Sequence, residues 1–345
     1  MSQRPVLGIT MGDPAGIGPE IAIQALAEPE VYKLCSPLLI GDTGVLKQAA
    51  RIVGADIEFR TVPEPSAAQF IHGTIDVLDL ENVNLDELVY GKIDAMAGRA
   101  AYEYIERVIE LALDEDVDAA VTGPIHKEAL NQAGYHYAGH TEIFTSLTKA
   151  QESFMMLASG SFRAVHVTSH MSLREACDRV TKDRILAAIR QADRALQEMD
   201  VTNPKIGVAG LNPHSGEGGL FGTEDMTEIL PAVEAAKAEG IEAEGPIPPD
   251  TVFCKARGGL YDLVVAMYHD QGHIPVKLDG FRLDKQGQDW ESVSGVNITL
   301  GLPVIRTSVD HGVAFDRAGQ GRANSQSMSD AIKLAAQLAR AKRGG

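Results

Sequence analysis

The sequence predicts an α/β protein in which a mostly parallel sheet is covered by layers of helices. Apolar runs and helical patterns alternate along the whole chain, and several of the apolar runs show no polar alternation. A strand that is apolar throughout is buried on both faces, which is typical of parallel sheets covered by helices. With 345 residues the chain exceeds one compact core, so we expect two α/β/α domains with a central cleft.

The chain begins with a predicted strand at 6–11, a glycine-rich turn and a helix at about 19–27. Such a turn can bind a phosphate group through its backbone N–H groups. The spacing here does not match the GxGxxG pattern of dinucleotide-binding turns. Two interpretations stay open: cofactor binding at Gly12, Gly16 and Gly18, or a tight turn that needs glycine for its backbone.

The other elements follow in order, and no linker divides the chain cleanly. Further strands are expected at 37–41, 119–123, 153–159, 163–169, 206–214, from 263 and within 296–312. Helices are expected at 42–53, 95–113, 142–149, 181–199, 223–239 and 329–343, and residues 57–92 are expected to be irregular. A domain of residues 1–130 plus 296–345, with 131–295 inserted as a second domain, is at least as consistent with this order as a tandem pair.

The net charge of −17 argues against binding to nucleic acids or anionic membranes. An anionic substrate would therefore need a local cluster of basic groups. The three cysteines, Cys35, Cys177 and Cys254, form no CxxC pair, which predicts reduced thiols in the cytoplasm. We see no signal-peptide pattern and no apolar run near ~20 residues, so neither secretion nor membrane insertion is expected.

Three of the apolar runs close on a histidine: His170, His214 and His269. The carboxyl ends of parallel strands meet at one edge of a sheet, where ligands bind. Three imidazoles with an open position are typical of a catalytic zinc site, although other divalent ions can take such ligands. A single histidine at a strand end is more often an ordinary hydrogen-bonded residue, so the prediction of a metal depends on the three together.

Basic side chains are expected near the same strand ends. Lys277 lies eight residues after His269, beyond Pro275, and we expect it on the same loop. Arg306 follows another apolar run and suits bidentate binding of a phosphate or a carboxylate. The alternative for both Lys277 and Arg306 is an ordinary charged side chain on the solvated surface.

His140 and Thr141 lie in a polar loop just before a predicted helix. A threonine at the start of a helix is most often an N-cap. Taken alone, the pair is explained by capping and needs no ligand.

Several long polar motifs occur in one order along the chain. They are Thr10–Glu20, Thr122–Lys127, Gly139–Glu142, Asn212–Gly219, Tyr268–Gly272 and Asn297–Pro303 with Arg306–Gly312. On these motifs the chain resembles the 4-hydroxythreonine-4-phosphate dehydrogenase (PdxA) family over nearly its whole length. The resemblance implies a fold like that of isocitrate and isopropylmalate dehydrogenases, dependence on NAD or NADP, and a homodimer with a shared active site.

The resemblance also assigns roles to individual residues. It implies a divalent metal, preferably Zn²⁺ with Mg²⁺, Mn²⁺ or Co²⁺ as alternatives, bound by His170, His214 and His269. It implies substrate contacts by His140, Thr141, Lys277, Asn297 and Arg306. For the glycine-rich turn, the resemblance favours a segment that lines a cleft over a dinucleotide-binding turn.

One departure from the family bears on the substrate. The segment 282–295 is longer than in the family members of the pyridoxine pathway, and it resembles the branch that acts on D-threonate or D-erythronate 4-phosphate. We therefore expect oxidation of the 3-hydroxyl of such an acid and decarboxylation to dihydroxyacetone phosphate, with Lys277 or Asp270 as the base. The alternatives are a dehydrogenase of vitamin B6 biosynthesis, a His₃-metal aldolase or hydrolase that uses no nucleotide, and a sugar-phosphate sensor.

Overall fold

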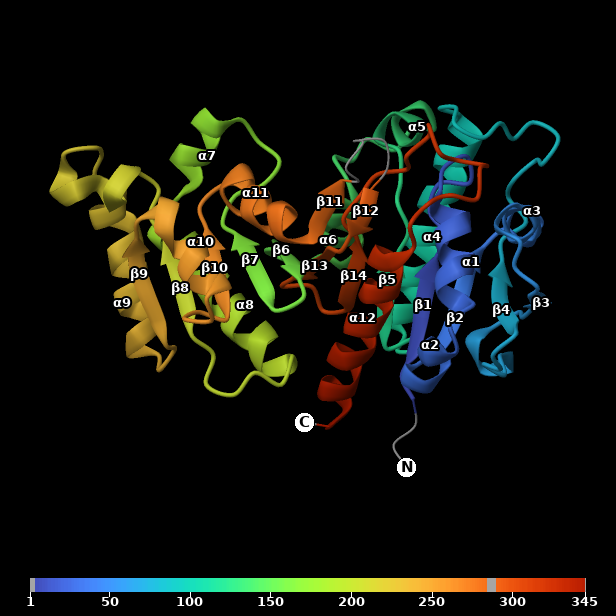
Figure 1. Ribbon diagram of the computed structural model, residues 1–345, viewed down its shortest axis with the longest axis horizontal. Helices are drawn as coiled ribbons and strands as arrows, with labels where there is room; N and C mark the ends of the chain where they lie inside the picture. The colour runs from blue at the N-terminus through green and yellow to red at the C-terminus, as the bar shows by residue number, and fades with distance from the viewer. Residues whose placement is uncertain (1–3, 284–289, 345) are drawn as a thin grey trace. The chain divides into compact units, whose positions relative to one another are not determined.

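The structure, a computed structural model, describes residues 4–283 and 290–344 (Figure 1). The chain forms two compact units. Unit 1 comprises Met1–Glu152 and Leu302–Gly345, and unit 2 comprises Ser153–Gly301. Among the described residues, none of the helices combines the length and the apolar character that a membrane span requires.

Unit 1 contains a parallel sheet with the strand order β3-β4-β2-β1-β5-β14. Its strands are β1 (Val6–Thr10), β2 (Ser36–Gly41), β3 (Glu58–Thr61), β4 (Thr74–Asp79), β5 (Ala119–Thr122) and β14 (Ile305–Val309). Its helices are α1 (Gly18–Leu26), α2 (Pro29–Leu34), α3 (Thr43–Val53), η1 (Pro65–Ala67), α4 (Ala95–Leu113), α5 (Lys127–Gln132), α6 (His140–Thr148) and α12 (Gln326–Gly344).

Local sequence explains where the helices of unit 1 begin and end. The Asp42 carboxylate accepts hydrogen bonds from two backbone N–H groups at the start of α3, and Asp94 caps α4 in the same way. Helix α3 ends at Gly54, whose φ of 68° is accessible to glycine at little cost. These helices therefore start and stop at signals that the sequence contains.

Helices cover both faces of the unit 1 sheet. Gly8 of β1 faces Val108 of α4, because a Cβ atom on Gly8 would lie 2.7 Å from that side chain. Thr307 of β14 faces the opposite side, where its hydroxyl donates to the Ala331 carbonyl of α12. Since side chains alternate along a strand, Arg306 must lie on the same face as Gly8.

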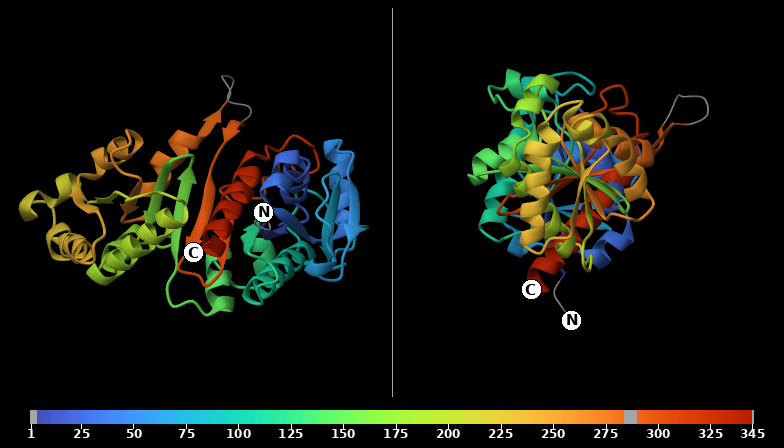
Figure 2. Two further views of the ribbon diagram at one scale, coloured as in Figure 1. Left: turned by 90° about the horizontal axis from the view of Figure 1, so that it is seen from below. Right: turned by 90° about the vertical axis from the view of Figure 1, so that its left-hand side faces the viewer.

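Unit 2 contains a mixed sheet with the strand order β13-β6-β7-β10-β8-β9 (Figure 2). Its strands are β6 (Phe154–Ser159), β7 (Phe162–His166), β8 (Ile206–Ala209), β9 (Ala243–Ile247), β10 (Leu263–Ala266) and β13 (Val296–Leu300). Its helical segments are α7 (Leu173–Arg179), α8 (Lys182–Glu198), η2 (Pro213–Gly219), η3 (Asp225–Ile229), α9 (Leu230–Ala238), α10 (Pro249–Arg257) and α11 (His269–Gly280).

Strands β7, β10, β8 and β9 are parallel neighbours, whereas β6 pairs antiparallel with both β7 and β13. A buried apolar cluster lies between this sheet and helices α10 and α11, and includes Val264 and Val276. A separate antiparallel pair, β11 (Phe281–Leu283) and β12 (Trp290–Val293), falls in the predicted 282–295 segment. Residues 284–289 of that segment lie outside the described residues.

The α/β class is confirmed, and two local expectations are corrected. Residues 57–92 are not wholly irregular, because they contain β3 and β4 of the unit 1 sheet. Lys277 is not on a loop, because α11 begins at His269 and continues through Pro275. The proline and Gly272 both resemble helix-ending residues, which explains why the helix was missed.

Candidate active site

The carboxyl edge of the unit 2 sheet carries the three predicted metal-binding histidines. His170 follows β7, His269 follows β10 and His214 follows β8. Because β7, β10 and β8 are adjacent parallel strands, their carboxyl ends lie side by side. The topology therefore brings the three loops to one edge, as the sequence predicted.

His269 and His170 are near neighbours at this edge. Their ring centroids are 5.8 Å apart. Two imidazoles that share a tetrahedral zinc ion, with Zn–N distances of about 2.1 Å, would have centroids roughly 5 Å apart. The distance between the two rings is thus close to the distance expected for two histidines that bind the same metal ion.

The tautomer of His269 also fits a metal ligand. Its Nδ1 atom lies 2.7 Å from a carboxylate oxygen of Asp270. A carboxylate accepts hydrogen bonds, so Nδ1 is the donor in this contact and Nε2 is the nitrogen that would bind a metal ion. Metal-binding histidines in proteins are commonly oriented by such a carboxylate.

His214 lies on the strained turn His214–Gly218. All five of its residues have positive φ, from 41° to 78°. His214, Ser215 and Glu217 are not glycine, and the left-handed region costs such residues roughly 1–2 kcal/mol each. The His214 ring lies 6.3 Å from that of Phe221. Within the described residues, no three His, Cys, Asp or Glu side chains are close enough to hold a metal ion.

Two buried histidines lie behind His269. The His273 ring stacks on His269 at 3.6 Å, and its Nδ1 lies 3.1 Å from Nε2 of His166. His166 Nδ1 in turn donates to the Met155 carbonyl. Burial lowers the pKa of His166 to about 4 and also lowers that of His273, so both rings are neutral at ordinary pH. Neither histidine is among the residues predicted from the sequence.

Gly272 explains how closely helix α11 approaches these rings. A Cβ atom at Gly272 would lie 2.4 Å from His166 Nε2. Any larger residue would push the first turn of α11, and with it His269, away from β7.

Two further predicted substrate contacts belong to unit 2. Lys277 lies on α11 with its ammonium 4.9 Å from the centre of the Phe281 ring. Asn297 lies on β13, and its side-chain carbonyl oxygen is buried without a hydrogen-bond partner. A buried acceptor without a donor is costly, and a ligand donor would satisfy it.

Arg306 is the most deeply buried basic group of unit 1. It is 2% exposed, and its guanidinium donates to the Thr122 hydroxyl at 2.9 Å. Its guanidinium carbon also lies 5.6 Å from the centre of the Phe144 ring. Burial lowers the pKa of Arg306 to about 9, with an opposing contribution from the charge of Glu142. The group therefore stays cationic at neutral pH.

His140 and Thr141 form the first turn of α6. The N-cap of this helix is Gly139 and no side chain caps it, so capping does not explain the pair. The Nε2 atom of His140 is buried without a hydrogen-bond partner. Burial, and then the charge of Arg306, hold the pKa of His140 well below its usual range. A neutral imidazole has one N–H group, which can donate a hydrogen bond to an anionic ligand while the neighbouring guanidinium pairs with the ligand's charge.

The glycine-rich turn is buried along its whole length. A Cβ atom would meet the Pro124 carbonyl at 2.5 Å from Gly12, Val313 at 2.9 Å from Gly16, and the Met11 carbonyl at 2.2 Å from Gly18. Packing alone therefore accounts for all three glycines. A role in cofactor binding stays a prediction.

The turn also contains Asp13, which is not among the residues predicted from the sequence. Asp13 is fully buried; one carboxylate oxygen accepts from the Ala15 N–H, and the other has no partner. Burial raises the pKa of Asp13 to about 7, with a smaller contribution from Asp94. Its aspartate identity was visible in the sequence, but its burial was not.

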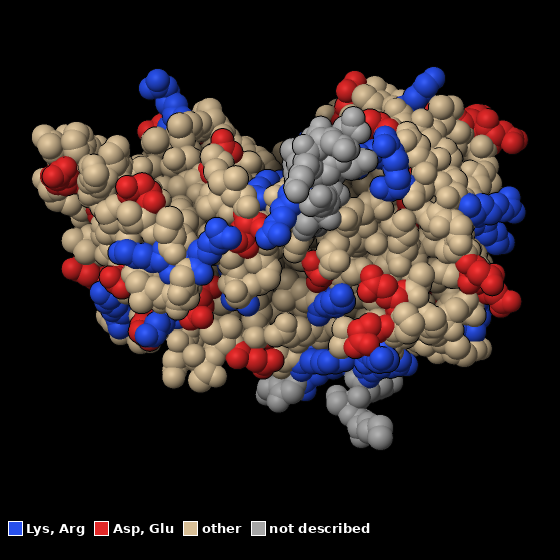
Figure 3. Space-filling view, viewed as in Figure 1, with Lys and Arg blue, Asp and Glu red and all other residues tan. Residues whose placement is uncertain are grey.

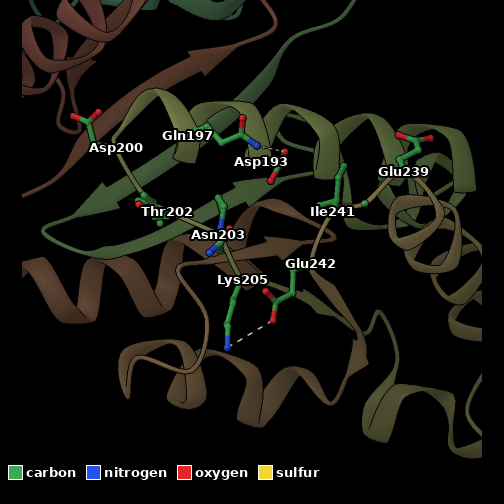
Figure 4. A pocket seen from close by; sticks show the side chains of 12 residues that line it. Asp193, Gln197, Asp200, Thr202, Asn203, Lys205, Glu239, Ile241 and Glu242 are labelled. Carbon is green, nitrogen blue, oxygen red and sulfur yellow. Dashed lines mark hydrogen bonds and ion pairs between the residues drawn. The ribbon is translucent and has the colours of Figure 1, made fainter. Parts of the chain in front are cut away.

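A cavity of about 920 Å³ lies elsewhere in unit 2 (Figure 4). Its lining includes residues that precede β8 and β9, so it lies at the amino edge of the sheet. It contains four carboxylates, and its one lysine, Lys205, is paired with Glu242 at 3.6 Å. An acidic lining does not suit a phosphorylated acid, and this cavity is a poor candidate for the active site.

Arg306 is the second residue of β14, so it lies within a strand and not after its carboxyl end as the sequence predicted. Imidazoles at a sheet edge and a buried guanidinium are typical of α/β enzymes that act on small anionic molecules. Comparison with known proteins identifies the family. The family described as "Pyridoxal phosphate biosynthetic protein PdxA" matches residues 33–335. The chain belongs to this family.

Similar proteins cover nearly the whole chain. It is 47% identical to D-threonate 4-phosphate dehydrogenase from Cupriavidus necator, over 97% of each chain. Two solved structures titled 4-hydroxythreonine-4-phosphate dehydrogenase, from Klebsiella pneumoniae and Burkholderia phymatum, are each 44% identical. They match with TM-scores of 0.83 and 0.82, covering 97% and 98% of this chain and 99% of each of theirs. The isocitrate and isopropylmalate dehydrogenase-like fold is thus confirmed.

Proposed function

We propose that the protein oxidises the 3-hydroxyl of a four-carbon 4-phosphorylated acid, D-threonate or D-erythronate 4-phosphate. The product would lose CO₂ and become dihydroxyacetone phosphate. The observation that carries this proposal is the histidine edge of unit 2, with His269 oriented by Asp270 and close to His170. The printed name of the relative from Cupriavidus necator supports the choice of D-threonate 4-phosphate.

A divalent metal at His170, His214 and His269, and a bound NAD or NADP, would supply Lewis acidity and a hydride acceptor. The chain's own groups would bind and orient the acid. Arg306 suits the phosphate, because it is cationic and carries a planar fork of N–H donors. Thr122 holds that fork in place. Anchoring the phosphate on carbon 4 would orient the neighbouring carbon 3, whose hydroxyl is oxidised.

We propose Lys277 as the base that takes the proton of the 3-hydroxyl. Asp270, the other candidate, has one of its oxygens hydrogen-bonded to His269. Bound NAD or NADP would accept the hydride of carbon 3, and this oxidation would give a 3-keto acid. The bond between carbons 1 and 2 then breaks, carbon 1 leaves as CO₂, and the electron pair on carbon 2 is protonated.

Two alternatives come from specific observations. The solved structures titled 4-hydroxythreonine-4-phosphate dehydrogenase favour a substrate with an amine on carbon 2, as in vitamin B6 biosynthesis. The histidine edge alone would also suit an aldolase or a hydrolase without a nucleotide. The relatives' names favour a dehydrogenase.

The test is to replace each histidine singly. We expect His170→Ala, His214→Ala and His269→Ala to lose tightly bound metal and nicotinamide reduction while staying folded. His72→Ala is the control, because His72 is an exposed histidine of unit 1. Full metal content and unchanged kcat in one of the three variants would remove that histidine from the site.

We also propose that the protein is a homodimer with a shared active site. Among the described residues of one chain, no three His, Cys, Asp or Glu side chains are close enough to hold a metal ion, and a second chain would supply the further ligands. Sedimentation equilibrium should give twice the mass of one chain. A monomer that is fully active at the same concentration would contradict the proposal.

A further inference from the structure

We infer that Asp225 and Gln271 are positioning residues that hold the loops of His214 and His269 in place relative to each other. The inference rests on the proposed function, because it concerns the same histidine edge. Both side chains are buried, Asp225 fully and Gln271 at 8% exposure. Both side chains are hydrogen-bonded to groups of the histidine loops, so we expect any effect on the reaction to act through other residues.

Asp225 braces the segment that leads into the turn His214–Gly218. Its carboxylate accepts from the backbone N–H of Leu211 at 2.9 Å and of Asn212 at 3.2 Å. It also accepts from the Asn212 side-chain amide at 2.9 Å. Three donors on one buried carboxylate fix the backbone just before His214.

The brace is relevant because the turn is strained. Non-glycine residues persist at positive φ when the surrounding structure holds them there, and such positions cluster at functional sites. The Asn212 carbonyl accepts from the Ser215 N–H at 3.0 Å, so the braced residue itself closes the turn. Asp225 begins a short π-helical segment, another feature that is frequent at functional sites.

Gln271 connects this loop to the one that carries His269. Its side-chain carbonyl accepts from the Met267 N–H at 2.6 Å, and its amide donates to the Gly210 carbonyl at 2.8 Å. A backbone N–H can only donate and a backbone carbonyl can only accept, so both the orientation and the roles of the amide are fixed. Gln271 therefore ties the end of β10 to the end of β8.

Gly210 is the point where the two positioning residues meet. Its carbonyl binds Gln271, and a Cβ atom on it would lie 2.7 Å from the Asp225 carboxylate. Its N–H donates to the Ile247 carbonyl of β9. The histidine loops are thus held to each other and to the sheet through one backbone position.

The experiment measures Zn²⁺ affinity by competition with a chromophoric chelator, together with Tm, for Asp225→Asn and Gln271→Met. Asn replaces one carboxylate oxygen by an amide NH₂ group, which faces N–H donors. Met keeps the volume but loses both hydrogen bonds. We expect a roughly ten- to hundred-fold loss of Zn²⁺ affinity, the range for outer residues that orient metal ligands.

Asp76→Asn is the matched control. Asp76 is a buried carboxylate of unit 1 that accepts from the N–H groups of Gln69 and Phe70, a similar brace in the other unit. It should lower Tm and leave Zn²⁺ affinity within about two-fold of the parent protein, a small change in free energy. Unchanged affinity in Asp225→Asn and Gln271→Met, or an equal loss in Asp76→Asn, would overturn the inference while the proposed function stands.

Hydrogen exchange keeps the two proposals distinguishable. If the parent protein takes up no Zn²⁺, the proposed metal role fails, and exchange at residues 211–218 and 267–270 decides the inference. Faster exchange confined to these segments in the Asp225 and Gln271 variants would support the inference that these two residues hold the histidine loops in place. Exchange equal to that of the parent would overturn it.

Discussion

Arg306 combines two properties that are rarely found together in one side chain: it is buried, and it stays cationic at neutral pH. The whole chain is acidic, so its long-range field should repel a phosphorylated acid. Binding must then depend on short-range groups. This makes Arg306 the strongest single candidate for the phosphate contact.

Replacing Arg306 tests this assignment. Arg306→Lys keeps the charge but loses the planar fork, and Arg306→Ala loses both, so kcat/KM should fall in both variants and further in Arg306→Ala. Loss of a charge-assisted contact costs on the order of 1.5–3 kcal/mol, or roughly ten- to a hundred-fold in kcat/KM. The control substrate is the same acid without its phosphate, which should be poor with the parent enzyme and lose much less on mutation. Equal losses for both substrates would remove Arg306 from the phosphate site.

Asp13 gives a prediction about pH. The unfolded chain ionises this carboxyl near its ordinary pKa of 3.8, whereas the folded protein keeps the proton until about pH 7. Unfolding therefore releases a proton between these values, and the free energy of unfolding falls as pH rises through this window. The contribution is at most on the order of 4 kcal/mol.

Asp13→Asn should remove this dependence. Denaturant titrations at a series of pH values would give the free energy of unfolding of both proteins. We expect the variant to gain stability over the parent between about pH 4 and 7, with a constant difference outside that window. Parallel curves would show that Asp13 ionises normally in the folded protein.

Residue identity was predictable at this scale, and spatial relations were not. The histidines were found because strand ends and imidazoles are both visible in a sequence. The supporting residues Asp225, Gln271 and His166 were missed, because most of their partners lie 13 to 107 positions away. No local pattern marks a buried carboxylate as the brace of a distant loop.

Helices α4 and α5 show how a single glycine sets an element's position. A Cβ atom on Gly98 of α4 would lie 2.2 Å from the Ala129 carbonyl oxygen of α5. The clash is with backbone, so no side chain can move aside. The two helices approach this closely because residue 98 is glycine.

Gly98→Ala should therefore destabilise the protein, although alanine is about 1 kcal/mol better than glycine in an unconstrained helix. Overpacking of this kind costs roughly 1–3 kcal/mol, measured as a lower free energy of unfolding. Arg99→Ala on the same helix is the control, since that side chain is 54% exposed and should tolerate the change. A stabilised Gly98→Ala variant would mean that α4 and α5 separate easily.

Elements with strong local patterns were predicted well, and elements held by distant partners were not. The apolar strands and the amphipathic α4 and α8 lie close to their expected ranges. Strand β4 was missed because it contains Asp76, whose burial depends on Arg60 and on backbone donors elsewhere. Helix α11 was missed because a proline and a glycine lie inside it. In both cases tertiary contacts override the local signal.

At the scale of the whole molecule, the candidate residues differ in where they lie. The three predicted metal-binding histidines follow the carboxyl ends of strands, Arg306 and Asn297 lie within strands, and Lys277, His140 and Thr141 lie on helices. Lys, Arg, Asp and Glu side chains are interspersed over the face shown in Figure 3, and the described residues there form no broad basic field. This distribution agrees with the net charge of −17. Recognition of an anionic substrate is therefore expected from local groups such as the buried Arg306 and the half-buried His140.

The most direct test of the account is a comparison of two substrates with the parent enzyme. The measurement is kcat/KM for D-threonate 4-phosphate and for 4-phosphohydroxythreonine, by nicotinamide reduction with NAD and with NADP, together with released CO₂. We expect D-threonate 4-phosphate to have the higher kcat/KM, with one CO₂ for each reduced nicotinamide. A preference for 4-phosphohydroxythreonine would assign the protein to vitamin B6 biosynthesis, and no nicotinamide reduction with either substrate would contradict the proposed dehydrogenase reaction.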